Sequence, residues 1–408
     1  MSRLTKYCPS LGGNLLVLVV GLMIWKFFLQ MISPYESVYI FALGGSGITL
    51  GVLSTIQMLF STLFRIPGGY IADKHRRSRV IGYALIASSL GYVFYIFAKS
   101  WVWLLPGAII LSIKALADPA TEAIKADSVN PDNRGRGYAI INTLPDIPAL
   151  IAPVLGGYLV INEASSYGIS LTGIRTVYTF LLVGVILTGF ILLLFLMDIH
   201  TPKDESLRYG FNMVRETLFM IKESESSLRR LLLLGGFFMF CFHLDSSMRS
   251  VFAISAGLST VQWGWIVSFT SLISLFSGLL IGGLVDRFGR KRVFIPSIIV
   301  LGLSTLLFVF SKSYYMFLLA RIIGGIGLYG RMISFQVLVA DSVPVDVRGR
   351  IMAIYTIFSS LGSSSAILLS GFLYDVFKEL PFLVSFLAYV LAAGVAIMFL
   401  DEPEVKQL

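Results

Sequence analysis

The amino-acid sequence predicts an all-α membrane protein with twelve transmembrane helices in two pseudo-symmetric six-helix bundles. Three observations lead to this prediction. Hydrophobic residues make up 56% of the 408 residues and charged residues only 13%, whereas a soluble domain carries about 25% charged residues. The mean hydropathy is +0.83. Two different motifs each occur twice, about 213 residues apart, which indicates duplication of a half-length unit.

Twelve apolar stretches are long enough to cross a membrane, because a crossing helix needs about 20 such residues. We expect them near residues 12–32, 47–71, 80–98, 102–126, 137–161, 176–197, 230–255, 262–285, 293–311, 314–340, 350–374 and 381–400. The predicted domains are an N-terminal six-helix bundle (1–200), a cytoplasmic linker with an amphipathic helix (201–229) and a C-terminal six-helix bundle (230–408).

Lysine and arginine predict the orientation, because cytoplasmic loops retain them. With both termini on one side, that side carries 22 of the 32 Lys and Arg residues and the opposite side carries four. We therefore expect a multi-pass protein of the cell membrane with cytoplasmic N- and C-termini. Its net charge of +9 then faces anionic lipid rather than nucleic acid. The two cysteines lie in different contexts and indicate no disulfide framework.

The first repeated motif places an acid among bases after spans 2 and 8. It runs from Gly69 through Asp73 to Arg77 in the first half. In the second half it comprises Gly282, Asp286, Arg287 and Arg290. The glycines allow a neighbouring helix to approach, and a carboxylate at the rim can cap a facing helix N-terminus. The alternative is that these loops are only signals for orientation.

Two halves of six spans, with G-x-x-x-D-R-x-G-R-[RK] after spans 2 and 8, resemble the major facilitator superfamily over essentially the whole chain. The second copy matches nearly completely, while Lys74 and Arg76 replace the usual Arg and Gly of the first. The resemblance implies a transporter that works by alternating access. It also implies that Asp73 faces the start of span 11, that Asp286 faces the start of span 5, and that these contacts latch the cytoplasmic side.

Span 5 contains Ala152-Pro153, followed by Gly156 and Gly157. This stretch resembles the G-P-x-x-G-G element that is typical of exporters exchanging substrate for protons, with Ala152 in place of the first Gly. It adds Pro153 and Gly157 to the expected gating residues. The alternative is a packing kink without directional meaning.

Ionisable residues within spans are functional candidates, because burying a charge in a membrane is costly. Span 4 carries Lys114, Asp118 and Glu122 at i, i+4 and i+8, and Pro119 interrupts its backbone ladder. The candidates for proton coupling are Asp118, Asp146 and Asp245. The candidates for substrate binding are Lys26, Gln30, Lys114, His243, Arg249 and Arg331. The alternative is that Lys114–Asp118 and Asp245–Arg249 are static salt bridges.

The resulting functional hypothesis is proton-coupled efflux, as an antiporter, of an amphipathic drug-like compound or metabolite. An alternative is a proton-coupled transporter or facilitator of an organic anion, because cations at membrane depth outnumber acids. A non-transporting receptor is the third. The sequence has no nucleotide-binding loop, metal-ligand spacing or catalytic triad, so we expect no enzyme, no metal and no cofactor apart from the coupling proton. The expected partners are a small-molecule substrate and the lipid bilayer, for a monomer that binds no nucleic acid.

Overall fold

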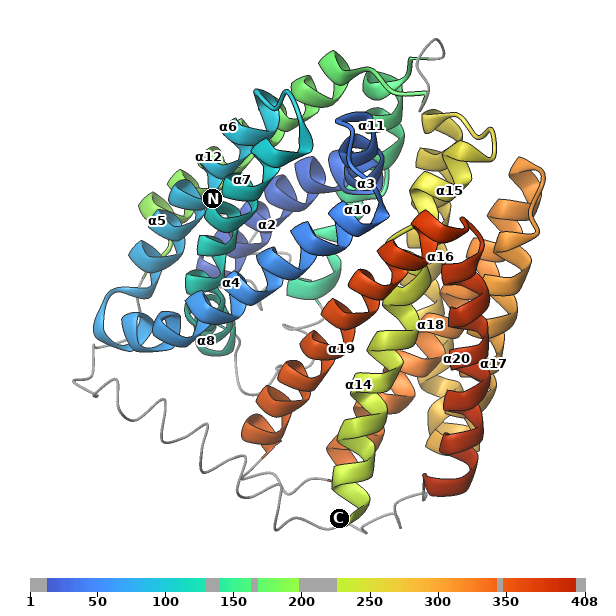
Figure 1. Ribbon diagram of the computed structural model, residues 1–408. Helices are drawn as coiled ribbons and strands as arrows, with labels where there is room; N and C mark the ends of the chain where they lie inside the picture. Colours follow the sequence, from blue (N-terminus) through green and yellow to red (C-terminus); the bar gives the residue numbers. More distant parts are fainter. Residues whose placement is uncertain (1–12, 129–139, 163–167, 198–225, 343–347, 401–408) are drawn as a thin grey trace. The chain divides into compact units, whose positions relative to one another are not determined.

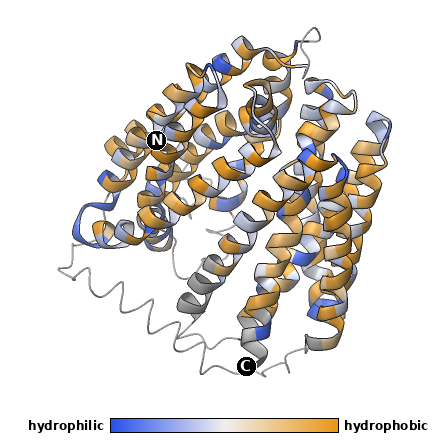
Figure 2. Cartoon of the chain, viewed as in Figure 1, coloured by the Kyte–Doolittle hydropathy of each residue, from blue (hydrophilic) through white to orange (hydrophobic). Residues whose placement is uncertain are grey.

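The computed structural model describes residues 13–128, 140–162, 168–197, 226–342 and 348–400 (Figure 1). These residues are nearly all helical, and an isolated bridge between Ile161 and Ile169 is the β feature among them. Hydrophobic residues cover most of the helices (Figure 2). Leu194, Leu280 and Met398 are 73%, 72% and 72% exposed, which suits contact with lipid rather than water. The all-α membrane class predicted from the sequence is confirmed.

The chain divides into two compact units. The first comprises residues 1–44 and 56–212, and the second comprises residues 45–55 and 213–408. Residues 45–55 thus pack with the second unit although they lie in the first half of the sequence. The amphipathic helix expected within 201–229 lies, up to residue 225, outside the described residues.

The helices of the first half follow one another with short connections and several breaks. They are α2 (Gly13–Ile32), η1 (Ser33–Tyr35), α3 (Glu36–Ala42), α4 (Gly47–Lys74), α5 (Arg77–Ser89), α6 (Gly91–Ile96), η2 (Trp101–Trp103), α7 (Leu104–Leu111), η3 (Ser112–Ala117), α8 (Asp118–Ser128), α10 (Asp146–Ala149), α11 (Ala152–Val160) and α12 (Leu171–Phe195).

The helices of the second half are longer and less interrupted. They are α14 (Ser226–Ser246), α15 (Arg249–Ser255), α16 (Thr260–Phe288), α17 (Arg290–Val309), α18 (Tyr314–Ser342), α19 (Arg348–Val376) and α20 (Leu380–Phe399). Among the described residues of both halves, nine helices are long and apolar enough to span a membrane. The expected spans 7, 8 and 11 correspond to α14 with α15, to α16, and to α19, and α16 is bent by 41°.

The first span is longer than its sequence pattern predicts. The helical segment continues from α2 through η1 into α3, so the candidate span covers Gly13–Ala42. The predicted span ended near residue 32, directly before Ser33 and Pro34. In the structure Pro34 occupies the first turn of η1, where its missing N–H costs no hydrogen bond. The break is therefore a bend within the span.

Prolines also interrupt spans 4 and 5. In span 4 the α-helix gives way to the 3-10 turn η3, which ends just before Pro119. The Asp118 N–H donates to the Ala115 carbonyl, a bond that Pro119 cannot make because it lacks an N–H. The predicted interruption beside Asp118 is confirmed. In span 5, Pro145 directly precedes α10 and Pro153 lies in the first turn of α11.

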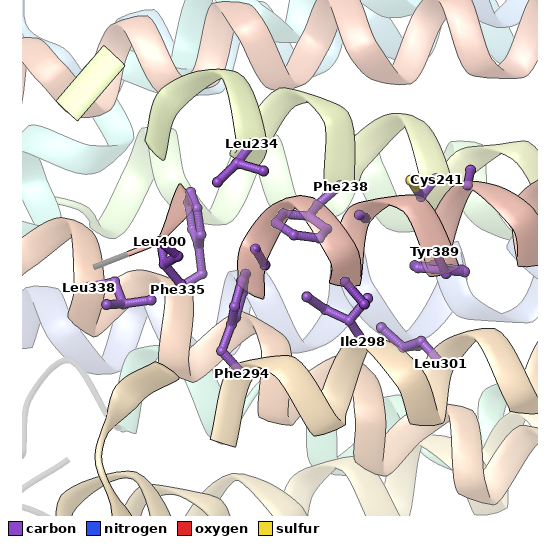
Figure 3. Close-up of a cluster of buried hydrophobic side chains, with 14 of the residues drawn as sticks. Leu234, Phe238, Cys241, Phe294, Ile298, Leu301, Phe335, Leu338, Tyr389 and Leu400 are labelled. Atoms are coloured by element: carbon purple, nitrogen blue, oxygen red, sulfur yellow. The ribbon is translucent and has the colours of Figure 1, made fainter. Parts of the chain in front are cut away.

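Aromatic and aliphatic side chains form the core of the second unit (Figure 3). The Phe238 and Phe294 rings meet edge to face at 5.0 Å, and Phe335 stacks on Phe294 at 6.1 Å. Cys241 and Tyr389 extend this buried cluster. The cluster ties α14 to α17, α18 and α20, so this unit has a packed interior of its own.

The start of α4 is held within the second unit by the end of α19. The Asp375 carboxylate accepts the backbone N–H groups of Gly47 at 2.7 Å and Ile48 at 3.0 Å. These are among the first N–H groups of a helix, which have no partner within it. A Cβ added to Gly47 or Gly371 would overlap the carbonyl oxygen of the other, so this crossing requires glycine at both positions.

Candidate functional site

The first unit contains two accessible ion pairs between different helices. Lys26 of α2 contacts Asp146, the first residue of α10, with 2.7 Å between Nζ and Oδ1. Their side chains are 28% and 43% exposed. Asp146 is the first residue of the four-residue helix α10, directly after Pro145. The two candidates Lys26 and Asp146 are thus brought together, while Gln30 lies one turn further along α2 and is partly buried.

The second pair joins Asp118 of α8 to Arg65 of α4. The Asp118 Oδ2 accepts from Arg65 Nη2 at 2.6 Å and from Nε at 3.3 Å. The two helical segments approach closely here, because a Cβ at Gly68 would lie 2.6 Å from the Leu116 carbonyl oxygen. Arg65 lies just before Pro67 in the second half of α4 and was not among the candidate site residues. The structure makes it the partner of a proton-coupling candidate.

The expected Lys114–Asp118 ion pair does not form in the described part of the chain. Lys114 instead lies over the indole of Trp25 on α2, with Nζ 3.8 Å from the ring centroid. The physical reason is η3, which contains Lys114. Residues four apart share a face of an α-helix, but in a 3-10 helix of three residues per turn they diverge by roughly 120°. The 3-10 segment beside Pro119 therefore places Lys114 and Asp118 on different faces of span 4.

Lys114 thus differs from the other cations of this site. Lys26 and Arg65 each contact a carboxylate, whereas Lys114 contacts the face of an aromatic ring. A cation–π contact contributes about 0.5–2 kcal/mol, and it leaves the ammonium free to bind an anion as well. Three cations (Lys26, Arg65 and Lys114) and two carboxylates (Asp118 and Asp146) give the site a net positive charge.

The second unit contains a buried ion pair that serves its interior. The Asp245 Oδ2 accepts from Arg249 Nη2 at 2.6 Å, from Arg249 Nε at 3.0 Å and from the Thr305 hydroxyl at 3.0 Å. Asp245 has no exposed surface. The structure thus contains the Asp245–Arg249 ion pair that was the alternative to functional roles for these two residues. Because Thr305 belongs to α17, the cluster crosslinks span 7 to span 9 inside one unit.

The remaining candidates of the second unit are also enclosed. Arg331 is 2% exposed and lies over the Phe238 ring at 6.0 Å, next to the hydrophobic core. The His243 ring contacts the Met239 carbonyl oxygen through Nδ1 at 2.9 Å, a contact within its own helix. These positions are consistent with structural roles, and their expected roles in substrate binding remain predictions.

The motif residues occupy the helix ends. The second repeated motif runs from Asp127 to Arg136 and recurs from Asp341 to Arg350. In the first half, Arg77 is buried and contacts Asp127 at 2.6 Å, so the two motifs meet. Asp73 is partly buried and Asp286 is exposed, while Arg287 lies against Phe288. No described atom lies within 4 Å of a Cβ built on Gly69 or Gly282. The close packing expected at these glycines is therefore not seen among the described residues.

The latch expected at Asp73 and Asp286 is not described by the structure, because loops 129–139 and 343–347 lie outside the described residues. Span 5 is described, and its glycine packs tightly. A Cβ at Gly156 would overlap the Met31 carbonyl oxygen of α2, and the Tyr35 hydroxyl donates to the Pro153 carbonyl at 2.6 Å. Both contacts fasten span 5 to span 1.

Sequence reasoning missed two members of the site. Trp25 carries no charge, and an aromatic residue in a span contacts lipid or the membrane interface as readily as it contacts a ligand. Its position directly before Lys26 was the available signal. Arg65 was not predicted as the partner of Asp118, because the register of α4 against α8 depends on packing between helices.

Known proteins resemble the chain over its whole length. The family model described as Major Facilitator Superfamily matches residues 16–274 and 237–408. The uncharacterized MFS-type transporter MJ1317 of Methanocaldococcus jannaschii is 22% identical over 385 residues, covering 91% of this chain and 90% of that protein. A crystal structure of a bacterial homolog of the human lysosomal transporter Spinster covers 97% of this chain and 98% of its own, with a TM-score of 0.76 and 18% identity.

Other relatives match shorter segments. The niacin transporter NiaP of Acinetobacter baylyi is 35% identical over 120 residues, covering 29% of this chain and only 27% of that protein. Multidrug resistance protein 1 of Bacillus subtilis is 29% identical over 147 residues, covering 36% of this chain and 38% of that protein.

Proposed function

Because the chain belongs to the Major Facilitator Superfamily, we propose that it is a proton-coupled transporter of small organic anions, with aromatic carboxylates as the substrate class. Family membership makes it a multi-pass membrane transporter of a small molecule and not an enzyme. The substrate class, the coupling ion, the direction of transport and the placement in the cell membrane with cytoplasmic termini are what we propose.

The observation that carries the substrate class is the position of Lys114. It lies in the middle of span 4 and contacts the Trp25 ring, while the nearest acid, Asp118, is bound to Arg65. A substrate carboxylate can form a charge-assisted hydrogen bond with Lys114, and an aromatic ring beside it can contact the Trp25 indole. That one of the relatives is named a niacin transporter supports this class, since niacin is an aromatic carboxylate.

The two ion pairs suggest how protons take part. Protonation of Asp118 releases Arg65, and protonation of Asp146 releases Lys26, because a neutral carboxyl no longer attracts the cation. A substrate anion can then replace the lost partner. A proton and an anion therefore bind together, so we propose symport rather than the exchange suggested by the element in span 5.

Efflux of amphipathic compounds is the second candidate. It is supported by the partial exporter element at Pro153 and by the relative named multidrug resistance protein. The contacts of Gly156 with Met31 and of Pro153 with Tyr35 give the element a packing role that does not depend on direction. Lys114 also opposes binding of a cationic drug, so we favour the anion.

Binding of a carboxylate and of its neutral amide to purified protein tests the substrate class. We expect nicotinate to bind and nicotinamide to bind at least tenfold more weakly, which corresponds to about 1.4 kcal/mol. Lys114→Gln should weaken nicotinate binding by a similar factor and leave the amide unaffected. Lys125→Gln is the matched control, because Lys125 pairs with Glu122 at the end of the same span. Equal affinities of wild type and Lys114→Gln would rule Lys114 out of the site.

A further inference from the structure

Glu36 is an acid within the first span that the sequence pattern had placed outside the membrane. It is the first residue of α3, and the candidate span ends at Ala42. Six residues at 1.5 Å each place its backbone roughly 9 Å inside this end of the span. Glu36 is partly buried, and it lies at the end of span 1 that is opposite to the N-terminus.

Four tyrosines from three helices form a cluster that begins one turn from this acid. Tyr39 lies one turn further along α3, Tyr92 and Tyr95 belong to α6, and Tyr178 belongs to α12. The Tyr178 ring is 5.6 Å from Tyr39, 6.2 Å from Tyr92 and 5.1 Å from Tyr95 between centroids. Tyr92, Tyr95 and Tyr178 each interact electrostatically with Glu36. The acid thus lies on the same short helix as Tyr39, within electrostatic reach of a cluster of tyrosines in the first unit.

Glu36 has no cation to balance its charge. Asp118, Asp146 and Asp245 each form an ion pair, but Glu36 forms none within the described ranges. Arg175 of α12 is the cation that faces the cluster, and it contacts Tyr39 and donates to the Ala98 carbonyl at 2.7 Å. Burying an unpaired carboxylate is costly, and the neutral acid avoids most of that cost.

The tyrosine cluster offers a hydroxyl for such an acid. The Tyr39 hydroxyl is committed to the Tyr95 carbonyl at 2.7 Å. The Tyr178 hydroxyl is buried without a hydrogen-bond partner in the described part of the chain. A neutral carboxyl O–H can donate to such a hydroxyl oxygen, and an ionised carboxylate can accept from its O–H. The cluster can therefore hydrogen-bond Glu36 both as a neutral carboxyl and as an ionised carboxylate.

We propose that Glu36 and the tyrosines around it form a proton-binding site, distinct from the ion pairs of Asp118 and Asp146. The carboxylate takes up one proton from the membrane face at which α3 ends, becomes a neutral carboxyl, and returns the proton when it ionises. This step makes and breaks one O–H bond of the carboxyl group and changes no other covalent bond. A role of this site in transport rests on the proposed proton coupling, whereas its existence does not.

Infrared difference spectra of the purified full-length protein at two pH values test the site without any substrate. Protonation of Glu36 should give a carbonyl-stretch band of a neutral carboxylic acid, and Glu36→Gln should remove it. Glu122→Gln is the matched control, because Glu122 is 69% exposed and pairs with Lys125. Tyr178→Phe should shift the band rather than remove it, and it provides a second variant if Glu36→Gln does not fold.

Transport measurements separate this proposal from the proposed function. If a pH gradient does not drive transport in the wild type but Glu36→Gln still removes the band, proton coupling fails and the site stands. If Glu36→Gln retains every band of the wild type, the site is overturned, whether or not a gradient drives transport. A Tyr178→Phe spectrum identical to the wild type would likewise contradict a Glu36 hydrogen-bonded to this tyrosine.

Discussion

Burial distinguishes the ion pairs of this protein at the scale of single residues. The Lys26–Asp146 and Arg65–Asp118 pairs keep between 28% and 46% of each side chain exposed. In the Asp245–Arg249 pair the exposed fractions are 1% and 11%. An accessible pair can open to release a cation for a substrate, whereas opening a buried pair leaves an uncompensated charge. The accessible pairs therefore suit a role in transport, and the buried pair suits a role in stability.

Two equivalent substitutions test this distinction. Asp245→Asn should lower the free energy of unfolding by about 3–5 kcal/mol, because it leaves Arg249 buried and unbalanced. Asp146→Asn should change it by no more than about 1 kcal/mol, because that pair is accessible to solvent. Thermal unfolding of the two purified variants in the same detergent measures the difference. Equal loss of stability in both would contradict the assignment of Asp245 to the fold.

At the scale of helices, function and irregularity coincide in the first half. Span 1 bends at η1, span 4 contains η3 and span 5 is divided into α10 and α11. Each interruption lies at or beside a proline: Pro34 in the first turn of η1, Pro119 after η3, and Pro145 and Pro153 at the starts of α10 and α11. These are also the segments that carry Glu36, Lys114 and Asp146, since a broken helix can turn a polar side chain away from its regular face. The more regular helices of the second half carry the buried core.

The contact between α4 and α19 leads to a prediction about local opening. Asp375→Ala should remove the acceptor of the Gly47 and Ile48 N–H groups, at a cost of about 1 kcal/mol. Hydrogen–deuterium exchange should then become roughly fivefold faster in a peptide covering residues 45–55. Glu379→Ala, four positions further along the chain, is the control and should leave this peptide unchanged. Unaltered exchange in Asp375→Ala would show that the carboxylate does not hold the helix start.

Elements and single residues differ in how far the sequence could predict them. Twelve spans, the duplication and the interruption at Pro119 follow from hydropathy and repeated motifs, which are local properties of the chain. The Asp245–Arg249 pair was predictable because both residues lie on one span. The partners of Asp118 and Lys114 were not predictable, because Arg65 and Trp25 belong to other helices. In addition, η3 changes the face of span 4 on which Lys114 lies. Glu36 was missed because the first span was predicted to end near residue 32.

At the scale of the whole molecule, duplication has produced two units with different contents. The first unit concentrates accessible charges and a cation bound to an aromatic ring. The second contains a closed polar cluster within a packed core. We therefore propose that the first unit binds substrate and protons, while the buried polar cluster of the second stabilises that unit.

Gradient-driven uptake by proteoliposomes tests the central claim, proton-coupled transport of an organic carboxylate, most directly. With an imposed pH gradient, the wild type should accumulate radiolabelled nicotinate above its external concentration, and a protonophore should abolish the accumulation. At least one of Asp118→Asn and Asp146→Asn should lose this accumulation and retain exchange of nicotinate across the membrane, because a neutral amide cannot carry the proton. Uptake by the wild type at the same rate with and without the gradient, or full gradient dependence in both variants, would contradict the account.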